Sequence, residues 1–136
     1  MTSFLLISIS VYAFYNSKSN IDSTKTEIKS ESVITKDLKV NIFGENNNSK
    51  EYQIDIKENE SAFDVLKRLD SENENFTFGY KEFSFGPFVT SINNYEPDYS
   101  KQFWSFELNG KQSEVGIGDY KVKKRDTLTF KLTNIE

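Results

Sequence analysis

The 136-residue sequence contains no cysteine and no histidine. Without cysteine there is no thiolate nucleophile, no disulfide and no site for a lipid anchor behind a signal peptide. Without histidine the chain lacks the commonest general base near neutral pH, and the two absences together remove the usual zinc ligands. The missing cysteine suits the cytosol and a bacterial exterior equally, so it leaves the redox compartment open.

Positive charge is also scarce. There are 17 Lys and Arg against 21 Asp and Glu, a formal net charge of −4, so no basic field draws the chain to a phosphate backbone. The one basic cluster, residues 121–125, is typical of a turn with solvated lysines. We therefore expect no nucleic-acid partner.

The remaining acidic and hydroxyl residues do not form a catalytic or metal pattern. No two carboxylates stand out as a converging pair, and Ser105 lacks the Gly-x-Ser-x-Gly setting of a serine nucleophile. Residues 70–75 space oxygens like a calcium loop, but its sixth and twelfth positions hold Asn75 and Lys81 instead of Gly and an acid. We expect no enzyme, no catalytic residue and no metal ligand.

The N-terminal segment, residues 1–15, is apolar. Within residues 4–15, ten of the twelve residues are apolar and none is charged, a length that suits the apolar region of a signal peptide or the tail of a truncated membrane anchor. A buried strand or helix of a cytosolic domain is the alternative. We interpret 1–15 as a signal or anchor and the Ser-, Thr- and Lys-rich residues 16–36 as a flexible linker, which predicts an extracytoplasmic protein, either membrane-anchored or secreted.

The folded domain is expected over residues 37–136. Apolar residues alternate over 38–43 and 52–57, which predicts a β-hairpin. Ala62, Val65, Leu66 and Leu69 then form one stripe of a short helix over 62–72, with Ser61 as N-cap and residue 64 in the capping-box position. Further strands follow near 76–85, 88–92, 103–108 and 126–132. The order predicts an α+β domain, with a helix across a mixed sheet of the β-grasp type.

The C-terminal half then resembles a known family. Its segments "GPFVTSINN", "FWSFELNG" and "VGIGDYKVKKRDTLTFKL" are similar to the C-terminal β-domain of the vitamin B12 carriers intrinsic factor and transcobalamin, and closer still to the transcobalamin-like C-terminal domains of bacterial exported proteins. The resemblance covers about residues 37–134. The matching positions are Gly86, Val89, Ser91, Ile92, Trp104, Asn109, Gly110, Gly116, Tyr120 and Asp126.

One position departs from that pattern. Arg125 stands where the family usually has glycine, which costs about 1 kcal/mol if the turn needs a positive φ. Elsewhere local chemistry agrees with the resemblance, because Asn109-Gly110 is a strong signal for a tight hairpin. Gly116 and Gly118 are expected to let the next strand bend.

The resemblance also implies a ligand. In the carriers this β-domain forms one side of a cobalamin site, and a large helical domain forms the other. By position, Val89 and Phe106 would face the corrin here, although core or cross-strand packing explains both residues as well. A small domain cannot bury every ring of a chain with 15% aromatic residues, so some rings are expected to line an exposed patch or pocket.

Together these features predict a non-catalytic extracytoplasmic binding module that holds a small ligand, with a corrinoid such as cobalamin as the candidate, on its aromatic face. The alternative is a cell-surface adhesion or assembly module that binds another protein or an envelope polymer. Membrane association would come from the N-terminal segment.

Overall fold

The computed structural model describes residues 36–136, so the predicted signal or anchor segment and nearly all of the predicted linker lie outside the described residues. Within them the chain forms an α+β unit with one α-helix. The elements are, in order, β1 (Leu38–Phe43), the 3-10 turn η1 (Glu45–Asn47), β2 (Ser49–Ile54), α2 (Ala62–Glu72), β3 (Phe78–Phe83), β4 (Gly86–Ile92), β5 (Gln102–Leu108), β6 (Lys111–Gln112) and β7 (Thr127–Asn134).

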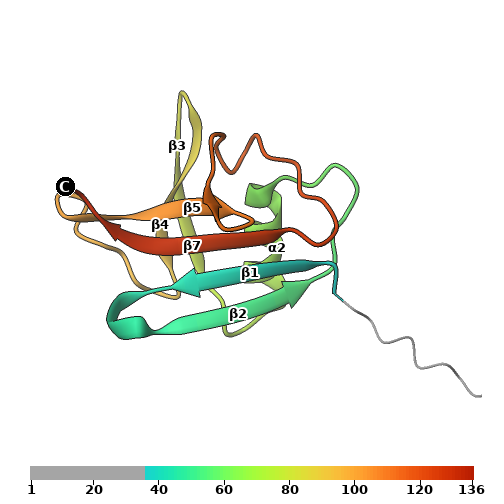
Figure 1. Cartoon of the computed structure of the whole chain (residues 1–136), viewed down its shortest axis with the longest axis horizontal. Helices are drawn as coiled ribbons and strands as arrows, with labels where there is room; N and C mark the ends of the chain where they lie inside the picture. Colours follow the sequence, from blue (N-terminus) through green and yellow to red (C-terminus); the bar gives the residue numbers. More distant parts are fainter. Residues whose placement is uncertain (1–35) are drawn as a thin grey trace, which may run out of the picture. The chain divides into compact units, whose positions relative to one another are not determined.

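The main sheet has five strands in the order β2-β1-β7-β5-β6 (Figure 1). The C-terminal strand β7 lies in its centre, parallel to β1 and antiparallel to β5. β3 and β4 form a separate two-stranded hairpin, which rises away from the main sheet in Figure 1. The first and last segments of the domain are thus hydrogen-bonded neighbours, and the strands between them are arranged around that pair.

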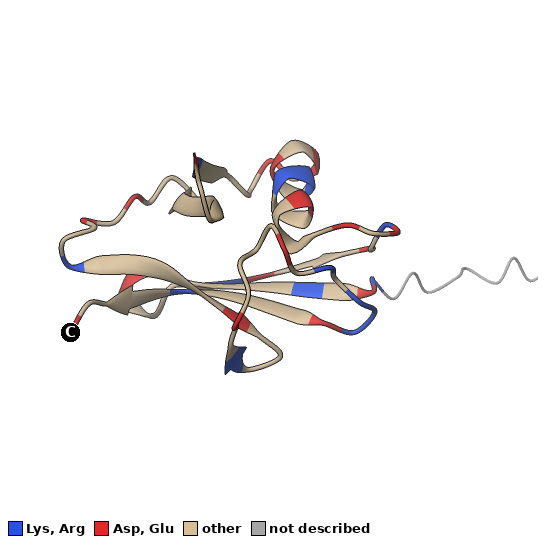
Figure 2. Ribbon diagram, turned by 90° about the horizontal axis from the view of Figure 1, so that it is seen from above, with Lys and Arg blue, Asp and Glu red and all other residues tan. Residues whose placement is uncertain are grey.

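One face of the main sheet carries the core. Leu38, Val40 and Ile42 of β1 are buried, and the residues between them are not. On β7 the same core contains Leu128 and Phe130, both fully buried. The opposite face is more polar. Ser105 of β5 lies there, and its hydroxyl donates a hydrogen bond to the Lys131 carbonyl oxygen of β7. α2 and the β3–β4 hairpin lie on the core side of the sheet in Figure 2.

The predicted helix is confirmed, with its bounds and its buried stripe of Ala62, Val65, Leu66 and Leu69. Ser61 caps it through a reciprocal pair of hydrogen bonds. The Ser61 hydroxyl accepts from the Asp64 N–H at 3.1 Å, and the Asp64 carboxylate accepts from the Ser61 N–H at 3.0 Å. A short helix is marginal in water alone, so this cap and the buried stripe fix where it forms.

The strand predictions held in type and shifted in bounds. The first hairpin pairs Leu38 with Ile54, and its second strand begins at Ser49, three residues before the expected start. Asn109 and Gly110 have φ values of 51° and 82°, as a tight hairpin turn requires. The expected strand around Gly116 and Gly118 does not form, because β6 ends at Gln112 and irregular chain continues to Asp126.

Charge is spread evenly over the described residues. Figure 2 shows Lys and Arg interspersed with Asp and Glu along the ribbon and not collected on one face. Between residues 36 and 136, no helix combines the length and apolar composition needed to cross a membrane.

Candidate functional site

A cleft of about 180 Å³ lies where β4, β5 and the chain after β6 meet. We call it the aromatic cleft. Its lining residues are Phe85, Pro87, Phe88, Val89, Trp104, Phe106, Gln112, Ser113, Val115, Gly116 and Ile117. They come from residues 85–89, 104–106 and 112–117, and the first stretch is well separated in sequence from the other two, so the cleft exists only once the β3–β4 hairpin has packed beside β5.

Both residues that the resemblance indicated, Val89 and Phe106, line this cleft. They are also core residues, with 5% and 9% of their surface exposed. Phe106 stacks on Phe130 with ring centroids 5.2 Å apart and an angle of 17° between the planes. The two readings that the sequence left open are therefore compatible, because each side chain packs into the core and presents an edge to the cleft.

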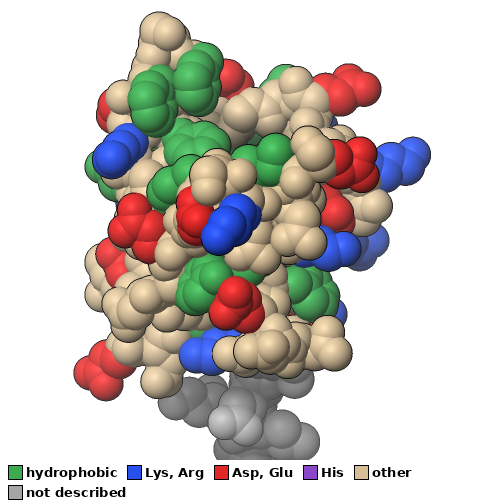
Figure 3. All heavy atoms as spheres, turned by 90° about the vertical axis from the view of Figure 1, so that its left-hand side faces the viewer, with side chains coloured by type: hydrophobic (Ala, Val, Ile, Leu, Met, Phe, Trp, Pro, Cys, Tyr) green, Lys and Arg blue, Asp and Glu red, His purple; other side chains and the backbone are tan. Residues whose placement is uncertain are grey.

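The rim of the cleft is apolar and exposed. Phe85 is 68% exposed, and Val115 on the other side is 47% exposed. Phe85 stacks on Phe83, with ring centroids 5.2 Å apart and planes 8° apart. Figure 3 shows hydrophobic side chains gathered at the top of the face in view. The β3–β4 hairpin projects toward the same end of the molecule in Figure 1. Exposed apolar groups clustered at a cavity mouth commonly mark a binding surface.

The irregular segment 113–126 forms one wall of the cleft and is fixed by backbone hydrogen bonds to the start of α2. The Phe63 N–H donates to the Ile117 carbonyl oxygen at 2.9 Å, and the Ala62 N–H donates to that of Tyr120 at 2.9 Å. These donors belong to the first turn of the helix, which has no partners for them within the helix. The wall thus supplies the carbonyl acceptors that the first turn of the helix lacks, and these hydrogen bonds keep Ile117 buried.

Asp126 ties the same segment to the β5–β6 turn. Its buried carboxylate accepts hydrogen bonds from the Tyr120 hydroxyl at 2.7 Å, the Lys123 N–H at 2.8 Å and the Asn109 side-chain amide at 3.0 Å. Burial, together with the bond to this carboxylate, raises the pKa of Tyr120 to about 12. At the adjacent Arg125 the φ angle is 70°, so the turn keeps the left-handed conformation for which the family uses glycine.

The lining of the aromatic cleft is mostly apolar and carries no charge. No ionisable side chain lines the aromatic cleft, and the Ser113 hydroxyl is already engaged with the backbone of Val115. Across residues 36–136, no group of three or more acidic side chains could hold a metal ion. The volume of the cleft lies below the roughly 300–1,000 Å³ of pockets that enclose drug-sized ligands. It can therefore cover an edge or one face of a larger apolar ligand.

Sequence reasoning missed most of the lining. Phe85 could have been found, because it lies beside Gly86-Pro87, a turn signal that places a neighbouring ring at an exposed hairpin end. Val115 and Ile117 carried no such signal, since nothing local indicates that irregular chain after β6 returns to β4.

Comparisons with known proteins agree on the fold. No curated protein matches the sequence. A crystal structure of a candidate metal-binding protein from Ruminococcus gnavus ATCC 29149 matches with a TM-score of 0.63 and 20% identity, over 74% of this chain and 99% of that one. Haptocorrin in complex with Cbi (cobinamide) matches with a TM-score of 0.67 and 17% identity, over 74% of this chain and 25% of haptocorrin. At these identities the matches establish a shared transcobalamin-like fold, and this chain corresponds to about a quarter of haptocorrin.

A sequence-family profile matches residues 59–134, which run from just before α2 to the end of β7 and make up more than half of the chain. The chain therefore belongs to the family described as a domain of unknown function, DUF4430.

Proposed function

We propose that this protein is a non-catalytic binding module that holds a small ligand in the aromatic cleft, and that a corrinoid such as cobalamin is the candidate ligand. The observation that carries the proposal is that Val89 and Phe106, the two positions indicated by the resemblance to the vitamin B12 carriers, line the same cavity, whose exposed rim includes Phe85. The fold shared with haptocorrin, solved with cobinamide, supports the choice of ligand.

The size of the cleft defines what such binding would look like. At about 180 Å³ it takes only part of a corrinoid, so most of the ligand would stay open to solvent or to a second protein surface. A flat, partly exposed contact gives modest affinity, because little apolar area is removed from water. We expect dissociation constants in the micromolar range, on the order of 10–100 µM.

The lining also supports the absence of catalysis, because the cleft offers neither an acid nor a base. We further propose a β-grasp fold, which the mixed sheet with α2 on its core side supports. An extracytoplasmic location, by anchoring or secretion, is proposed from the apolar residues 1–15 and the polar residues 16–36, which lie outside the described part of the chain apart from residue 36.

One observation favours a second candidate function, adhesion or assembly at the cell surface. Phe83 and Phe85 stack on each other while 49% and 68% exposed. Exposed aromatic pairs are frequent anchors of protein interfaces. In that case the occupant of the cleft rim would be a side chain of a partner protein or an envelope polymer.

A titration of the purified chain with cobinamide and with cobalamin, followed by calorimetry and by the absorbance of the corrin, tests the proposal. The expected result is heat and a spectral shift that saturate toward about 1 mM ligand and are already present at about 100 µM. Absence of both signals at that concentration overturns the corrinoid assignment and leaves adhesion as the candidate function.

Two exposed phenylalanines provide a matched pair of variants. Phe85→Ala removes a rim ring that is 68% exposed and should weaken binding about tenfold, the equivalent of about 1.4 kcal/mol of lost apolar contact. Phe43→Ala removes a ring that is 43% exposed on β1 and lines no described cavity, so binding should be unchanged. Equal effects of the two variants would place the ligand outside the aromatic cleft.

A further inference from the structure

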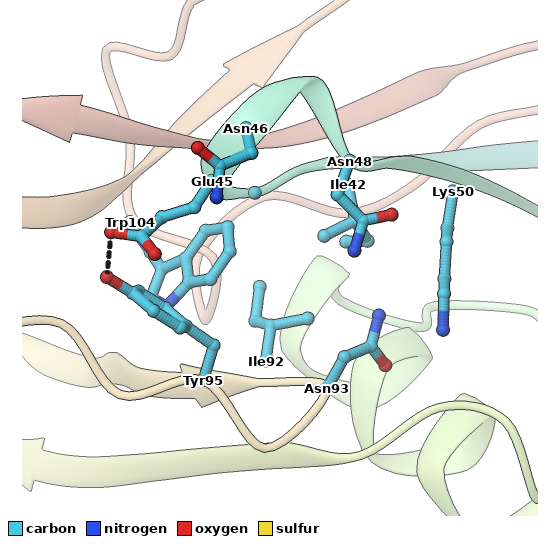
Figure 4. Close-up of a pocket in the computed structure, with 10 residues that line it drawn as sticks. Ile42, Glu45, Asn46, Asn48, Lys50, Ile92, Asn93, Tyr95 and Trp104 are labelled. Carbon is cyan, nitrogen blue, oxygen red and sulfur yellow. Dashed lines mark hydrogen bonds between the residues drawn. The ribbon is translucent and has the colours of Figure 1, made fainter.

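A second cavity, of about 290 Å³, shares Trp104 with the aromatic cleft. We call it the Trp104 pocket. It lies between the β1–β2 connection and the chain that follows β4, and Figure 4 shows its lining side chains. Ile42 and Ile92 give it an apolar floor, while Glu45, Asn48 and Lys50 add polar groups. Unlike the aromatic cleft, it therefore offers hydrogen-bonding partners of both kinds.

The Trp104 side chain brings an unpaired donor to this pocket. Its indole Nε1 is the one buried side-chain nitrogen or oxygen in residues 36–136 that has no hydrogen-bond partner, although Trp104 as a whole is only 5% exposed. In Figure 4 the nitrogen lies on the side of the indole that faces Tyr95 and Ile92. A buried donor without an acceptor is costly, and native structures rarely tolerate one without a functional or solvent partner.

Tyr95 does not supply an oxygen to that donor. Its ring meets the indole at 88°, with centroids 6.2 Å apart, which allows at most a weak contact between N–H and ring face. The Tyr95 hydroxyl donates instead to Glu45 Oε1 at 2.6 Å, and this bond raises the pKa of Tyr95. An oxygen acceptor for the Trp104 N–H must therefore come from outside the described chain.

The charges around the pocket indicate which acceptor fits. Glu45 and Lys50 both line it, so their formal charges cancel and neither a strong anion nor a strong cation is favoured. Within residues 36–136 the Glu45 carboxylate accepts its hydrogen bond, from Tyr95, at Oε1, which leaves Oε2 as an acceptor for a ligand N–H. A neutral group that accepts from Trp104 and also donates to a carboxylate meets both requirements. Hydroxyl groups and amides are of this kind, and a primary amide carries its acceptor and its two donors on separate atoms, which suits two partners on different sides of the pocket.

We propose that the Trp104 pocket is a second binding site, one that takes a small neutral compound with a primary amide group. The carbonyl oxygen accepts the Trp104 N–H, the amide nitrogen donates to Glu45, and the short alkyl part lies against Ile42 and Ile92. This site does not depend on the function proposed for the aromatic cleft.

The chain contains one tryptophan, so its fluorescence and its single indole N–H signal in a ¹H–¹⁵N NMR spectrum both report on Trp104. Because Trp104 also lines the aromatic cleft, the variant Phe85→Ala, which alters that cleft alone, distinguishes the two sites. The full chain is titrated with propionamide and, in parallel, with propionate, which has the same size and shape but a negative charge. We expect propionamide to shift the indole signal in a saturable way with a dissociation constant on the order of 10 mM, as the small size of the probe allows. Propionate should bind at least fivefold more weakly.

Two variants locate the interaction. Glu45→Gln, in an exposed turn, removes the charge and should bring propionate to within twofold of propionamide, whereas Glu58→Gln, an exposed carboxylate outside the pocket, should leave the ratio unchanged. Trp104→Phe keeps an aromatic ring but removes the N–H, and saturation-transfer NMR on the ligand should then show at least a fivefold loss of binding. Thermal unfolding confirms that this variant is folded, and if it is not, the Glu45→Gln ratio alone decides.

Three results would each overturn the proposal. The first is an indole signal that does not move up to 100 mM propionamide, or moves without saturating, which would mean that water alone satisfies the N–H. The second is equal affinity for propionamide and propionate in the unmodified chain. The third is a weakening of propionamide binding by Phe85→Ala, since that residue lines only the aromatic cleft.

Discussion

Replacing Asp126 with asparagine tests whether one carboxylate holds the wall of the aromatic cleft in place. The Asp126 carboxylate accepts three hydrogen bonds, from Tyr120, Lys123 and Asn109, at 2.7–3.0 Å. An asparagine has nearly the same shape but only one acceptor oxygen, and its amide group is itself a donor. In Asp126→Asn at least one of the three donors must therefore face another donor. Water cannot readily replace the lost acceptor, because Asp126 is only 6% exposed.

The expected loss follows from those contacts. A hydrogen bond to a charged group contributes about 1.5–3 kcal/mol, and a buried donor left unpaired costs about 1–3 kcal/mol. Since one strong acceptor oxygen remains, we expect Asp126→Asn to lower the free energy of unfolding by about 2–3 kcal/mol. A domain of this size is stable by about 5–15 kcal/mol, so the variant should still fold.

Urea denaturation followed by circular dichroism measures this change. With a slope of about 1 kcal/mol per molar urea, the midpoint should fall by about 2–3 M. Asp119→Asn is the matched control, because it changes an exposed carboxylate in the same segment and should move the midpoint by less than about 0.5 M. If Asp126→Asn moved it no further than this control, the three hydrogen bonds would not stabilise the fold.

Three further predictions concern single residues. Folding raises the pKa of Tyr120 to about 12, so this tyrosine stabilises the protein below its unfolded pKa of about 10 and stops doing so as pH rises through its folded pKa. Tyr120→Phe should therefore lose less stability than the unmodified chain between about pH 10 and 12. Urea midpoints measured across this range compare the two. Arg125→Gly should raise the free energy of unfolding by about 0.5–1 kcal/mol, since φ there is 70°, and an unchanged or lower midpoint would contradict the assigned strain. Ser61→Ala should cost about 1–2 kcal/mol near neutral pH, and urea midpoints should show this difference shrinking as pH falls below about 4. The hydrogen bonds from Ser61 hold the pKa of Asp64 below its usual value, and that contribution is lost as pH falls through the folded pKa.

The sequence predicted those elements whose cause is local. The helix over 62–72 was recognisable because its apolar stripe, its N-cap and its capping box lie within twelve residues. The first hairpin and the Asn109-Gly110 turn were recognisable for the same reason, since alternation and turn chemistry act between near neighbours. In each case the physical interaction and the sequence pattern span the same few residues.

What escaped prediction depends on contacts between distant segments. The segment 113–126 was expected to include a bent strand, but its hydrogen-bonding partners are the first turn of α2 and the side chain of Asn109. No pattern within the segment indicates those partners. The unpaired indole of Trp104 was equally hidden, because only the folded arrangement of Ile92 and Tyr95 around it decides whether an acceptor is present.

The buried and the exposed residues of the aromatic cleft should differ in how well they tolerate substitution. Val89 and Phe106 are buried, and Phe106 stacks on Phe130, so a substitution there alters the core and the ligand surface together. Phe85 and Val115 are exposed, and substitutions at such positions usually change stability by no more than about 0.5 kcal/mol. Under the proposed function, substitutions at the rim would therefore change the choice of ligand while the buried residues preserve the fold.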